Sequence, residues 1–535
     1  MLFNSYIFIF LFFPLCLAGL YLLERAGRGK AAKLWLVGFS LWFYGYFNPY
    51  YLAIMAGSIL FNYLIARLLL QSRQSCGRRQ ETQSMWHVPE GHADASAGHM
   101  TGQKDLNAGR GCRLVAFLAH SRTILTLGIC TNLAVLFYFK YYDFFVGNIN
   151  ALFGTDFLLK HLLLPLGISF FTFQQIGFLV DVYRRETAAD SFVDYALFVS
   201  FFPQLIAGPI VNGKEMLPQF AGIGRRRFSP TLFTGGLYLF VLGMGKKVLL
   251  ADTFGIAVDY GYRNVASLGS VDAVLVMVFY TLQLYFDFSG YCDMARGLGH
   301  MMGIEIPVNF RSPYRARNPV EFWKRWHITL NRFLLQYVYI PLGGNRKGEI
   351  RMYGNLFLVF CVSGVWHGAG WNFVVWGMLH GAVYVLVRMW QRRPNPRPFP
   401  GALSRFCGVA CTWLFVNIAW VFFRAQDVQQ ALSLFRQMAT GGIALPVAGI
   451  YEAFRLDEFW YIMKVLHLAD LPYSGMYLCA VFLAVALWLV FFHKNAGEMA
   501  EGFTPKAGNM VMTAVLFLWC VLSLSGVSTF LYFNF

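Results

Sequence analysis

The chain has 535 residues, of which 57% are hydrophobic and 18% aromatic, while only 13% are charged. Soluble domains carry about 25% charged residues, so this composition excludes a soluble multidomain enzyme, a disordered protein and a disulfide scaffold. The formal net charge of +17 is compatible with a nucleic-acid partner, with anionic lipid, with a phosphate-bearing substrate, or with the basic cytoplasmic loops of a membrane protein.

Apolar runs recur along the whole chain and predict an all-α polytopic membrane protein. A run of about twenty residues crosses about 30 Å of hydrocarbon, and we expect about nine to twelve transmembrane helices plus re-entrant or interfacial helices. The first run lacks a basic start and a small-residue cleavage site, so it is not expected to be a signal peptide. The candidate spans are 3–23, 34–47, 51–70, 124–146, 162–182, 232–250, 273–288, 356–366, 373–387, 406–423, 476–492 and 510–531.

Two basic segments predict the orientation of the chain. The loop 24–33 and the long segment 71–122 are both rich in Lys and Arg. They lie on the same side of the membrane if 34–47 and 51–70 form a hairpin. Because basic loops stay in the cytoplasm, we expect the N-terminus to lie on the outer side of the membrane.

The segment 71–122 is typical of a flexible cytoplasmic loop, because it is rich in Gly, Ala, Ser and Gln and has no hydrophobic periodicity. His87, His92 and His99 within it have no spacing that suits a compact metal site. A solvated linker is therefore the preferred interpretation, and no metal site is expected.

The segment 280–390 carries most of the residues with chemical potential, and we expect it to be the catalytic core of a single membrane domain covering 1–535. Asp287 and Asp293 are ionisable residues within an apolar run. Such residues often line a substrate path. The alternative, that they pair with nearby Arg side chains or cap a helix turn, is equally open.

A helix is expected to begin at Asn318-Pro319, which supplies a capping side chain and a proline in the first turn. Its apolar residues recur at helical spacing, which predicts an interfacial amphipathic helix. His327 lies on the apolar face, where a lone histidine is more often a hydrogen-bonded core residue than a catalyst. The expected apolar face consists of Trp323, Trp326, His327, Leu330, Leu334 and Tyr337.

His367 lies among tryptophans and glycines in the segment VSGVWHGAGWNFVVWG. Burial disfavours the imidazolium, so His367 is expected to be neutral near pH 7 and able to accept a proton. A neutral base in a dry pocket suits deprotonation of a hydroxyl that attacks an acyl thioester. Residue chemistry alone leaves the catalytic and the structural role equally open. His380, in a plain apolar helix, is expected to be structural.

Basic residues flank both histidines. Positive-inside bias explains most of them, but a few are candidates for holding an anionic donor, such as the phosphates of a CoA. The candidates are Arg317, Lys324, Arg325 and Arg346.

Several blocks of the chain together resemble the membrane-bound O-acyltransferase superfamily, in its bacterial branch typified by alginate O-acetylation proteins. The most specific blocks contain RWH and VWHG. The matching blocks are MLFNSYIFIFLFFP, LPLGISFFTFQQIGFLVDVYRRE, FFPQLIAGPIV, YFDFSGYCDMA, RWHITLNRFLLQYVYIPLGGNR, VSGVWHGAGWNFVVWG and WVFFRAQDVQQAL.

The resemblance implies a ring of transmembrane helices around a thin centre with a tunnel. It places the family's catalytic histidine at His367 and the second characteristic histidine at His327. The implied donor is cytoplasmic acetyl-CoA, with no bound cofactor or metal. The acetyl group then reaches an extracytoplasmic polysaccharide of the alginate, cellulose or peptidoglycan type, through a separate SGNH-type transferase and a synthesis or export complex. The expected substrate-lining or tunnel-lining residues are Asp287, Asp293, Trp323, Trp326, Trp366 and Asn331.

Some positions depart from the family's pattern, with Cys292 where Ser is common, Gln336 where Asp is frequent and Asn212 where Arg is frequent. These departures leave the identity of the acceptor open. The sequence is also compatible with two roles for His367, a base or a transient acyl carrier. The alternatives are a polysaccharide or precursor transporter and a scaffold in an export complex. The positive charge falls in cytoplasmic loops and beside the histidines, so membrane lipid and an anionic donor, and no nucleic acid, are the expected partners.

Overall fold

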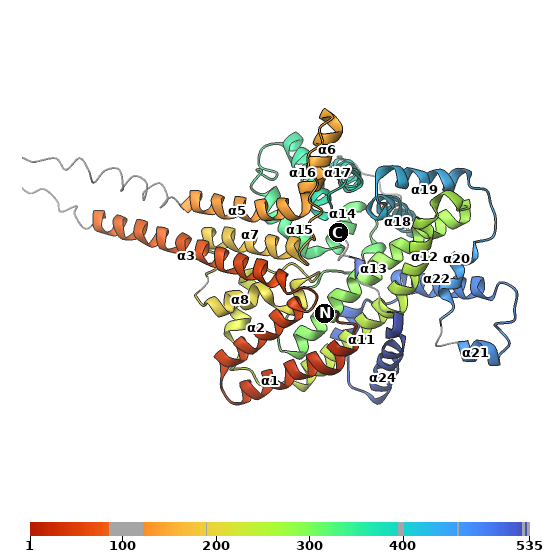
Figure 1. The fold of residues 1–535 in the computed structure, drawn as a ribbon, viewed down its shortest axis with the longest axis horizontal. Helices are drawn as coiled ribbons and strands as arrows, with labels where there is room; N and C mark the ends of the chain where they lie inside the picture. Colours follow the sequence, from red (N-terminus) through yellow and green to blue (C-terminus); the bar gives the residue numbers. More distant parts are fainter. Residues whose placement is uncertain (85–120, 189, 394–400, 457–459, 527–529, 532–535) are drawn as a thin grey trace, which may run out of the picture.

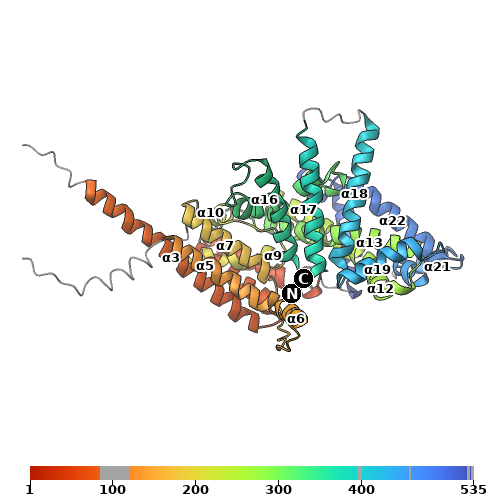
Figure 2. The same ribbon diagram turned by 90° about the horizontal axis from the view of Figure 1, so that it is seen from above.

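The computed structural model describes residues 1–535 except 85–120, 189, 394–400, 457–459, 527–529 and 532–535. The described residues form helices and no strands, which confirms the all-α prediction. Figures 1 and 2 show the helices gathered around α13 (Ser270–Met301), with the N-terminus near the centre and the ends of α3 and α5 projecting to one side.

The helix α13 forms the centre of the molecule because most of its length is buried. Small residues let it approach α11 (Pro230–Gly245) closely. A Cβ atom added to Gly243 would lie 2.6 Å from the carbonyl oxygen of Gly290, and one added to Gly297 would lie 2.6 Å from that of Gly236. Glycine contacts of this kind bring helix backbones together in membranes.

Seven helical segments among the described residues are long and apolar enough to span a membrane. Other apolar helices among the described residues are shorter than a full span. The helices α2 (Gly29–Gly45) and α7 (Ile168–Arg184) have 17 residues each, and α24 (Ala507–Leu522) has 16. The seven segments are Phe8–Arg25, Tyr50–Ser72, Ser121–Phe153, Ser270–Met301, Trp371–Gln391, Ala402–Arg424 and Ser474–Phe491.

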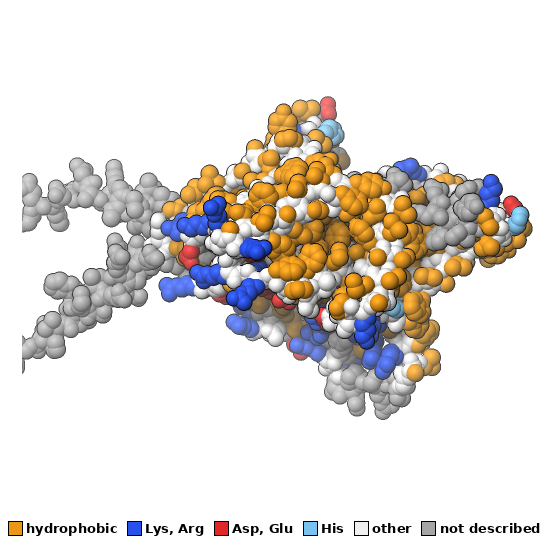
Figure 3. Space-filling model, turned by 90° about the horizontal axis from the view of Figure 1, so that it is seen from below, with side chains coloured by type: hydrophobic (Ala, Val, Ile, Leu, Met, Phe, Trp, Pro, Cys, Tyr) orange, Lys and Arg blue, Asp and Glu red, His pale blue; other side chains and the backbone are white. Residues whose placement is uncertain are grey.

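The surface is suited to a membrane. Large apolar side chains are exposed on many helices, and Figure 3 shows them as a broad orange area with Lys and Arg side chains gathered along its left and lower margins. A broad exposed area of apolar side chains indicates contact with lipid rather than with water.

Five α-helices lie among the residues that the structure describes up to Phe153. They are α1 (Phe13–Arg25), α2, α3 (Tyr50–Ser84), α5 (Ser121–Leu136) and α6 (Tyr142–Phe153). The helix α3 continues to Ser84 and so includes the first residues of the segment 71–122. Residues 85–120, with His87, His92 and His99, lie outside the described residues.

The predicted amphipathic helix after Asn318 is wrong in two respects. The segment is divided into α14 (Pro319–Arg325), α15 (Ile328–Leu334) and the π-helix η6 (Leu335–Tyr339). Its apolar face is packed inside the protein rather than in a membrane interface, since Trp326 and His327 are at most 1% exposed. The cause is a pairing of backbones, because the amide of Arg311 donates to the carbonyl of Arg325 and that of Ile328 to the carbonyl of Asn309.

The remaining helices surround this centre (Figures 1 and 2). They are α8 (Phe192–Ser200), α9 (Phe202–Leu205), α10 (Gly213–Ala221), α12 (Asp252–Arg263), α16 (Glu349–His367), α17 (Trp371–Gln391), α18 (Ala402–Arg424), α19 (Val428–Thr440), α20 (Ala448–Tyr451), α21 (Trp460–Val465), α22 (Ser474–Phe491) and α23 (Ala496–Glu501).

Candidate active site

His327 lies in the break between α14 and α15, with a left-handed backbone (φ 45°) and no exposed surface. Its Nδ1 atom lies 3.2 Å from Oδ1 of Asn309. The same oxygen accepts hydrogen bonds from the amide of Thr329 (3.1 Å) and from its hydroxyl (2.9 Å). Because Oδ1 is an acceptor, Nδ1 of the neutral His327 carries the proton and Nε2 holds the lone pair.

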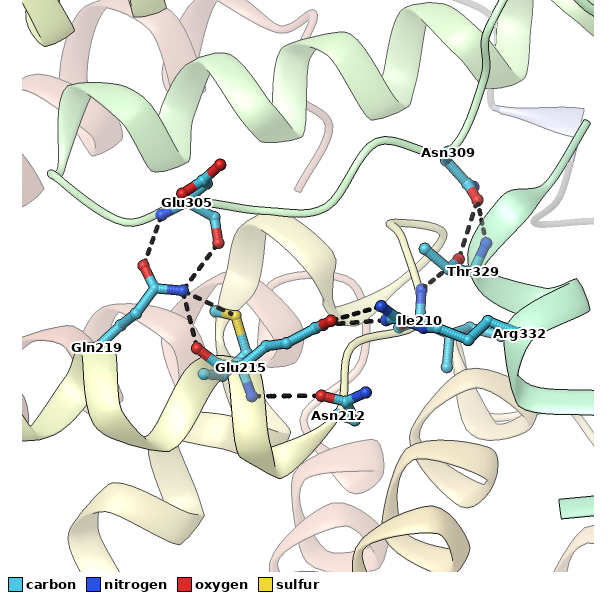
Figure 4. Close-up of polar contacts among 9 residues, drawn as sticks. Ile210, Asn212, Glu215, Gln219, Glu305, Asn309, Thr329 and Arg332 are labelled. Carbon is cyan, nitrogen blue, oxygen red and sulfur yellow. Dashed lines mark hydrogen bonds and ion pairs between the residues drawn. The ribbon is translucent and has the colours of Figure 1, made fainter. Parts of the chain in front are cut away.

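Asn309 is itself held in place. Its Nδ2 group donates to Sγ of Cys292 at 3.4 Å. Thr329 links the network to the next segment, because its hydroxyl accepts from the amide of Ile210 at 2.9 Å (Figure 4). The Cys292 departure from the family's pattern therefore lies beside the network that orients His327.

His367 is the last residue of α16 and is 4% exposed. Its ring centroid lies 6.5 Å from that of His327. The rings of Trp366, Trp376 and Phe423 surround it, with centroids 4.9, 5.1 and 5.1 Å away. The two histidines expected from the sequence are therefore brought together inside one aromatic enclosure.

Burial determines the charge of both histidines. It lowers the pKa of His327 to about 3. The pKa of His367 is lowered well below its usual range, first by burial and then by charge repulsion from His327, Lys140 and His380. Both rings are therefore neutral around pH 7, which is the form that accepts a proton.

Two cavities lie beside the end of α16, one lined by His367 and the other by Gly368 and Ala369. The smaller, which we call the His367 chamber, has a volume of about 30 Å³ and is lined by residues 164–170 together with Lys140, Ile206, Trp366 and His367. The α6 cavity, of about 300 Å³, is lined in part by Tyr142, Asp143, Gly368 and Ala369. The two share Lys140 and Leu164, so they lie next to each other.

A third space, the α15 cavity, lies on the other side of an aromatic stack. It has a volume of about 10 Å³ and is lined in part by Phe173, Thr329, Arg332 and Phe333. The ring of Phe173 stacks on Phe333 at 4.3 Å and on Trp366 at 5.1 Å. These three rings therefore separate the α15 cavity from the His367 chamber. A larger cavity of about 890 Å³, lined in part by α22 and α24, includes neither histidine in its walls.

The other residues expected at the site have well-defined contacts. Trp323 donates from Nε1 to Nδ1 of His380 at 3.2 Å. Trp326 lies 5.0 Å, ring to ring, from Trp420. Asn331 donates to the carbonyls of Trp323 (2.5 Å) and Trp326 (2.8 Å), and so holds the end of α14.

Asp287 and Asp293 each pair with a lysine. Asp287 lies 2.7 Å from Nζ of Lys247, and Asp293 lies 2.6 Å from Nζ of Lys246. Both lysines belong to the π-helix η3 (Lys246–Ala251). The structure thus places each carboxylate in an ion pair with lysine, not with the arginine suggested by the sequence.

The basic candidates for donor binding are at or near the surface. Arg317, Lys324 and Arg346 are exposed, and Arg325 pairs with Glu321 at 2.6 Å. Arg332 on α15 holds Glu215 through both carboxylate oxygens (Figure 4).

Sequence reasoning missed Asn309, Lys140 and Tyr141. Lys140 and Tyr141 donate hydrogen bonds to the carbonyls at the end of α16. The sequence could have indicated Lys140, because it is an ionisable residue in the apolar run 124–146. It could not have indicated Asn309, because a single asparagine after a helix is common in loops.

Fold and site together define a multi-pass membrane protein with two neighbouring buried histidines. Residues 182–426 match the model of the membrane-bound O-acyltransferase (MBOAT) family. The whole chain is 36% identical to 98% of a peptidoglycan O-acetyltransferase from Helicobacter pylori. A probable alginate O-acetylase from Pseudomonas aeruginosa is 37% identical to this chain over 83% of the chain and 75% of the length of that protein. A teichoic acid D-alanyltransferase from Streptococcus thermophilus is 28% identical over 50% of the chain and 69% of the length of that protein. The chain belongs to the MBOAT family and is a membrane acyltransferase.

Proposed function

We propose that this protein passes acetyl groups from cytoplasmic acetyl-CoA across the bacterial inner membrane, for O-acetylation of an extracytoplasmic polysaccharide. The observation that carries the proposal is the pair of neutral histidines, whose ring centroids lie 6.5 Å apart, enclosed by aromatic rings, with His367 lining the His367 chamber. Alignment of the whole chain with a peptidoglycan O-acetyltransferase supports a cell-wall glycan as the acceptor.

In the proposed reaction, an acceptor hydroxyl attacks the thioester carbonyl, so that a C–O bond forms and the C–S bond breaks. His367 takes the hydroxyl proton and returns it to the departing thiolate of CoA. Alternatively, His367 carries the acetyl group between two such steps. His327 assists through its Nε2 atom, which is unprotonated because the ring proton is on Nδ1, next to Oδ1 of Asn309. The enclosure of aromatic rings keeps water from hydrolysing the thioester.

The donor approaches from the cytoplasm in this proposal. Lys324 and Arg325 lie on α14, Arg317 lies just before it, Arg346 follows η6, and Arg332 lines the α15 cavity. Cationic side chains of this kind suit the phosphates of CoA. The N-terminus is then extracytoplasmic, and the α6 cavity faces an extracytoplasmic SGNH-type transferase that works with a polysaccharide synthesis or export complex.

Turnover of acetyl-CoA tests this proposal. The purified protein is reconstituted in liposomes and supplied with acetyl-CoA and the extracytoplasmic transferase. We expect release of free CoA and formation of an acetyl ester on glycan. A transporter of polysaccharide or precursor would show flux without CoA release, and a scaffold would show neither. Absence of CoA release from correctly folded protein would overturn the proposal.

The Asn309→Leu variant is expected to lower kcat for CoA release by about 100-fold, because Nδ1 of His327 then loses the acceptor that fixes the tautomer and the ring. Steady-state kinetics provide the measurement. Gln219→Leu is the matched control, since Gln219 bridges to the backbone of Glu305 in the same segment between α13 and α14 (Figure 4). A kcat for Asn309→Leu equal to that of Gln219→Leu would contradict the assignment.

A further inference from the structure

Two consecutive side chains of the π-helix η2 (Phe137–Tyr141) contact the end of α16. Nζ of Lys140 donates to the carbonyls of Trp366 (2.7 Å) and His367 (3.0 Å). The hydroxyl of Tyr141 donates to the carbonyl of Val365 at 2.9 Å. The π-turn is inserted in the continuous helical segment Ser121–Phe153. Such turns occur frequently at functional sites.

The contacts satisfy groups that the helix itself leaves unpaired. The last four carbonyls of an α-helix have no partner within the helix, and here three of them belong to Val365, Trp366 and His367. Gly368 follows in an extended conformation (φ −163°), not in the left-handed form that commonly closes a helix end. A cation at this end also complements the helix dipole.

Lys140 is itself fixed by a third contact. Its Nζ lies 3.3 Å from the hydroxyl of Ser169 on α7. An ammonium group has three N–H donors, and the carbonyls of Trp366 and His367 with this hydroxyl account for all three. Lys140 therefore holds protein groups in place, and it is not available as a donor to a reacting carbonyl.

We propose that Lys140 and Tyr141 are positioning residues that hold the His367 ring in its reactive place by clamping the end of α16. The proposal rests on the acyl transfer at His367 proposed above. Lys140 borders both the His367 chamber and the α6 cavity. The clamp therefore sets the position of His367 where the two spaces adjoin. A misplacement of about 1 Å costs about 100-fold in rate.

Lys140 also acts on the charge of His367. The titratable groups that act on the His367 ring are His327, Lys140 and His380, and each lowers its pKa. Without the Lys140 cation the pKa of His367 rises, so a smaller fraction of the ring is unprotonated at a given acidic pH. The acidic limb of the pH profile of kcat then moves to higher pH.

The test compares Lys140→Met, Lys140→Arg and Tyr141→Phe in reconstituted protein, with CoA release from acetyl-CoA as the readout. We expect Lys140→Met to lower kcat about 100-fold with KM changed by less than about twofold, and to move the acidic limb upward. Lys140→Arg, which keeps the cation, is expected to recover part of kcat. Tyr141→Phe is expected to lower kcat about tenfold without moving the limb.

Lys160→Met is the matched control, because Lys160 is exposed beside the same helix and lies over the rings of Tyr138 and Tyr142. It is expected to behave as the wild type. If Lys140→Met does not fold, Tyr141→Phe still tests the clamp. Turnover by Lys140→Met at the wild-type rate, or an equal loss in Lys160→Met, would overturn the clamp. Absence of turnover in the wild type would instead overturn the proposed function.

Discussion

His367→Ala is expected to reduce CoA release from acetyl-CoA by about 1,000-fold, the contribution of a well-placed general base. The reason is the position of the ring, which is neutral, enclosed by aromatic side chains and adjacent to His327. Steady-state kinetics on reconstituted protein provide the measurement, with protein amount and melting temperature measured in parallel.

His380→Gln is the control for this substitution. His380 is also fully buried and also contacts Trp376, at a ring-centroid distance of 4.9 Å, but its Nδ1 accepts a hydrogen bond from Trp323. We expect His380→Gln to lower the melting temperature while kcat falls less than about tenfold. If His367→Ala keeps full turnover, or if both variants lose activity equally, the role given to His367 is wrong.

Lys247→Met is expected to destabilise the fold by about 3–5 kcal/mol, because it leaves buried carboxylates without their cation. Nζ of Lys247 lies 2.7 Å from Oδ1 of both Asp252 and Asp287. Asp287 also accepts a hydrogen bond from the amide of Leu531 at 3.0 Å, which ties the C-terminal segment to the same charges. Unfolding in detergent, followed by intrinsic fluorescence, measures the loss.

A double variant that combines Lys247→Met with Asp287→Asn separates charge from shape. The Asp287→Asn change keeps an acceptor for the amide of Leu531 and removes one uncompensated charge, so we expect it to recover part of the stability. Arg392→Met is the control, because Arg392 pairs with Glu349 at the surface and such pairs contribute at most about 1 kcal/mol. Equal stability of Lys247→Met and Arg392→Met would contradict a structural role for this ion pair.

The sequence was sufficient to predict an all-helical membrane acyltransferase and to single out His327 and His367, which the structure brings to 6.5 Å between ring centroids. Apolar runs follow directly from the thickness of the bilayer, and the two motifs are specific. Among the described residues, seven segments reach the length of a full span, while the apolar helices α2, α7 and α24 are shorter. Hydrophobicity predicts which runs are apolar but does not determine where each helix ends.

The details around the histidines depended on contacts between distant segments. Helical spacing predicted one continuous helix through His327, whereas backbone pairing with Asn309 and Arg311 divides it. Nothing local to residues 318–337 encodes that pairing. Likewise, Lys140 is more than two hundred residues from the carbonyls that it caps, so only the fold reveals its position.

Transfer across a sealed membrane tests the central claim most directly. Inverted vesicles expose the cytoplasmic face, and acetyl-CoA labelled in the acetyl group is supplied outside, with the extracytoplasmic transferase and glycan inside. The account predicts labelled ester inside the vesicles and an equal amount of free CoA outside, both lost in His367→Ala. Entry of label without release of CoA, or equal transfer by His367→Ala, would contradict it.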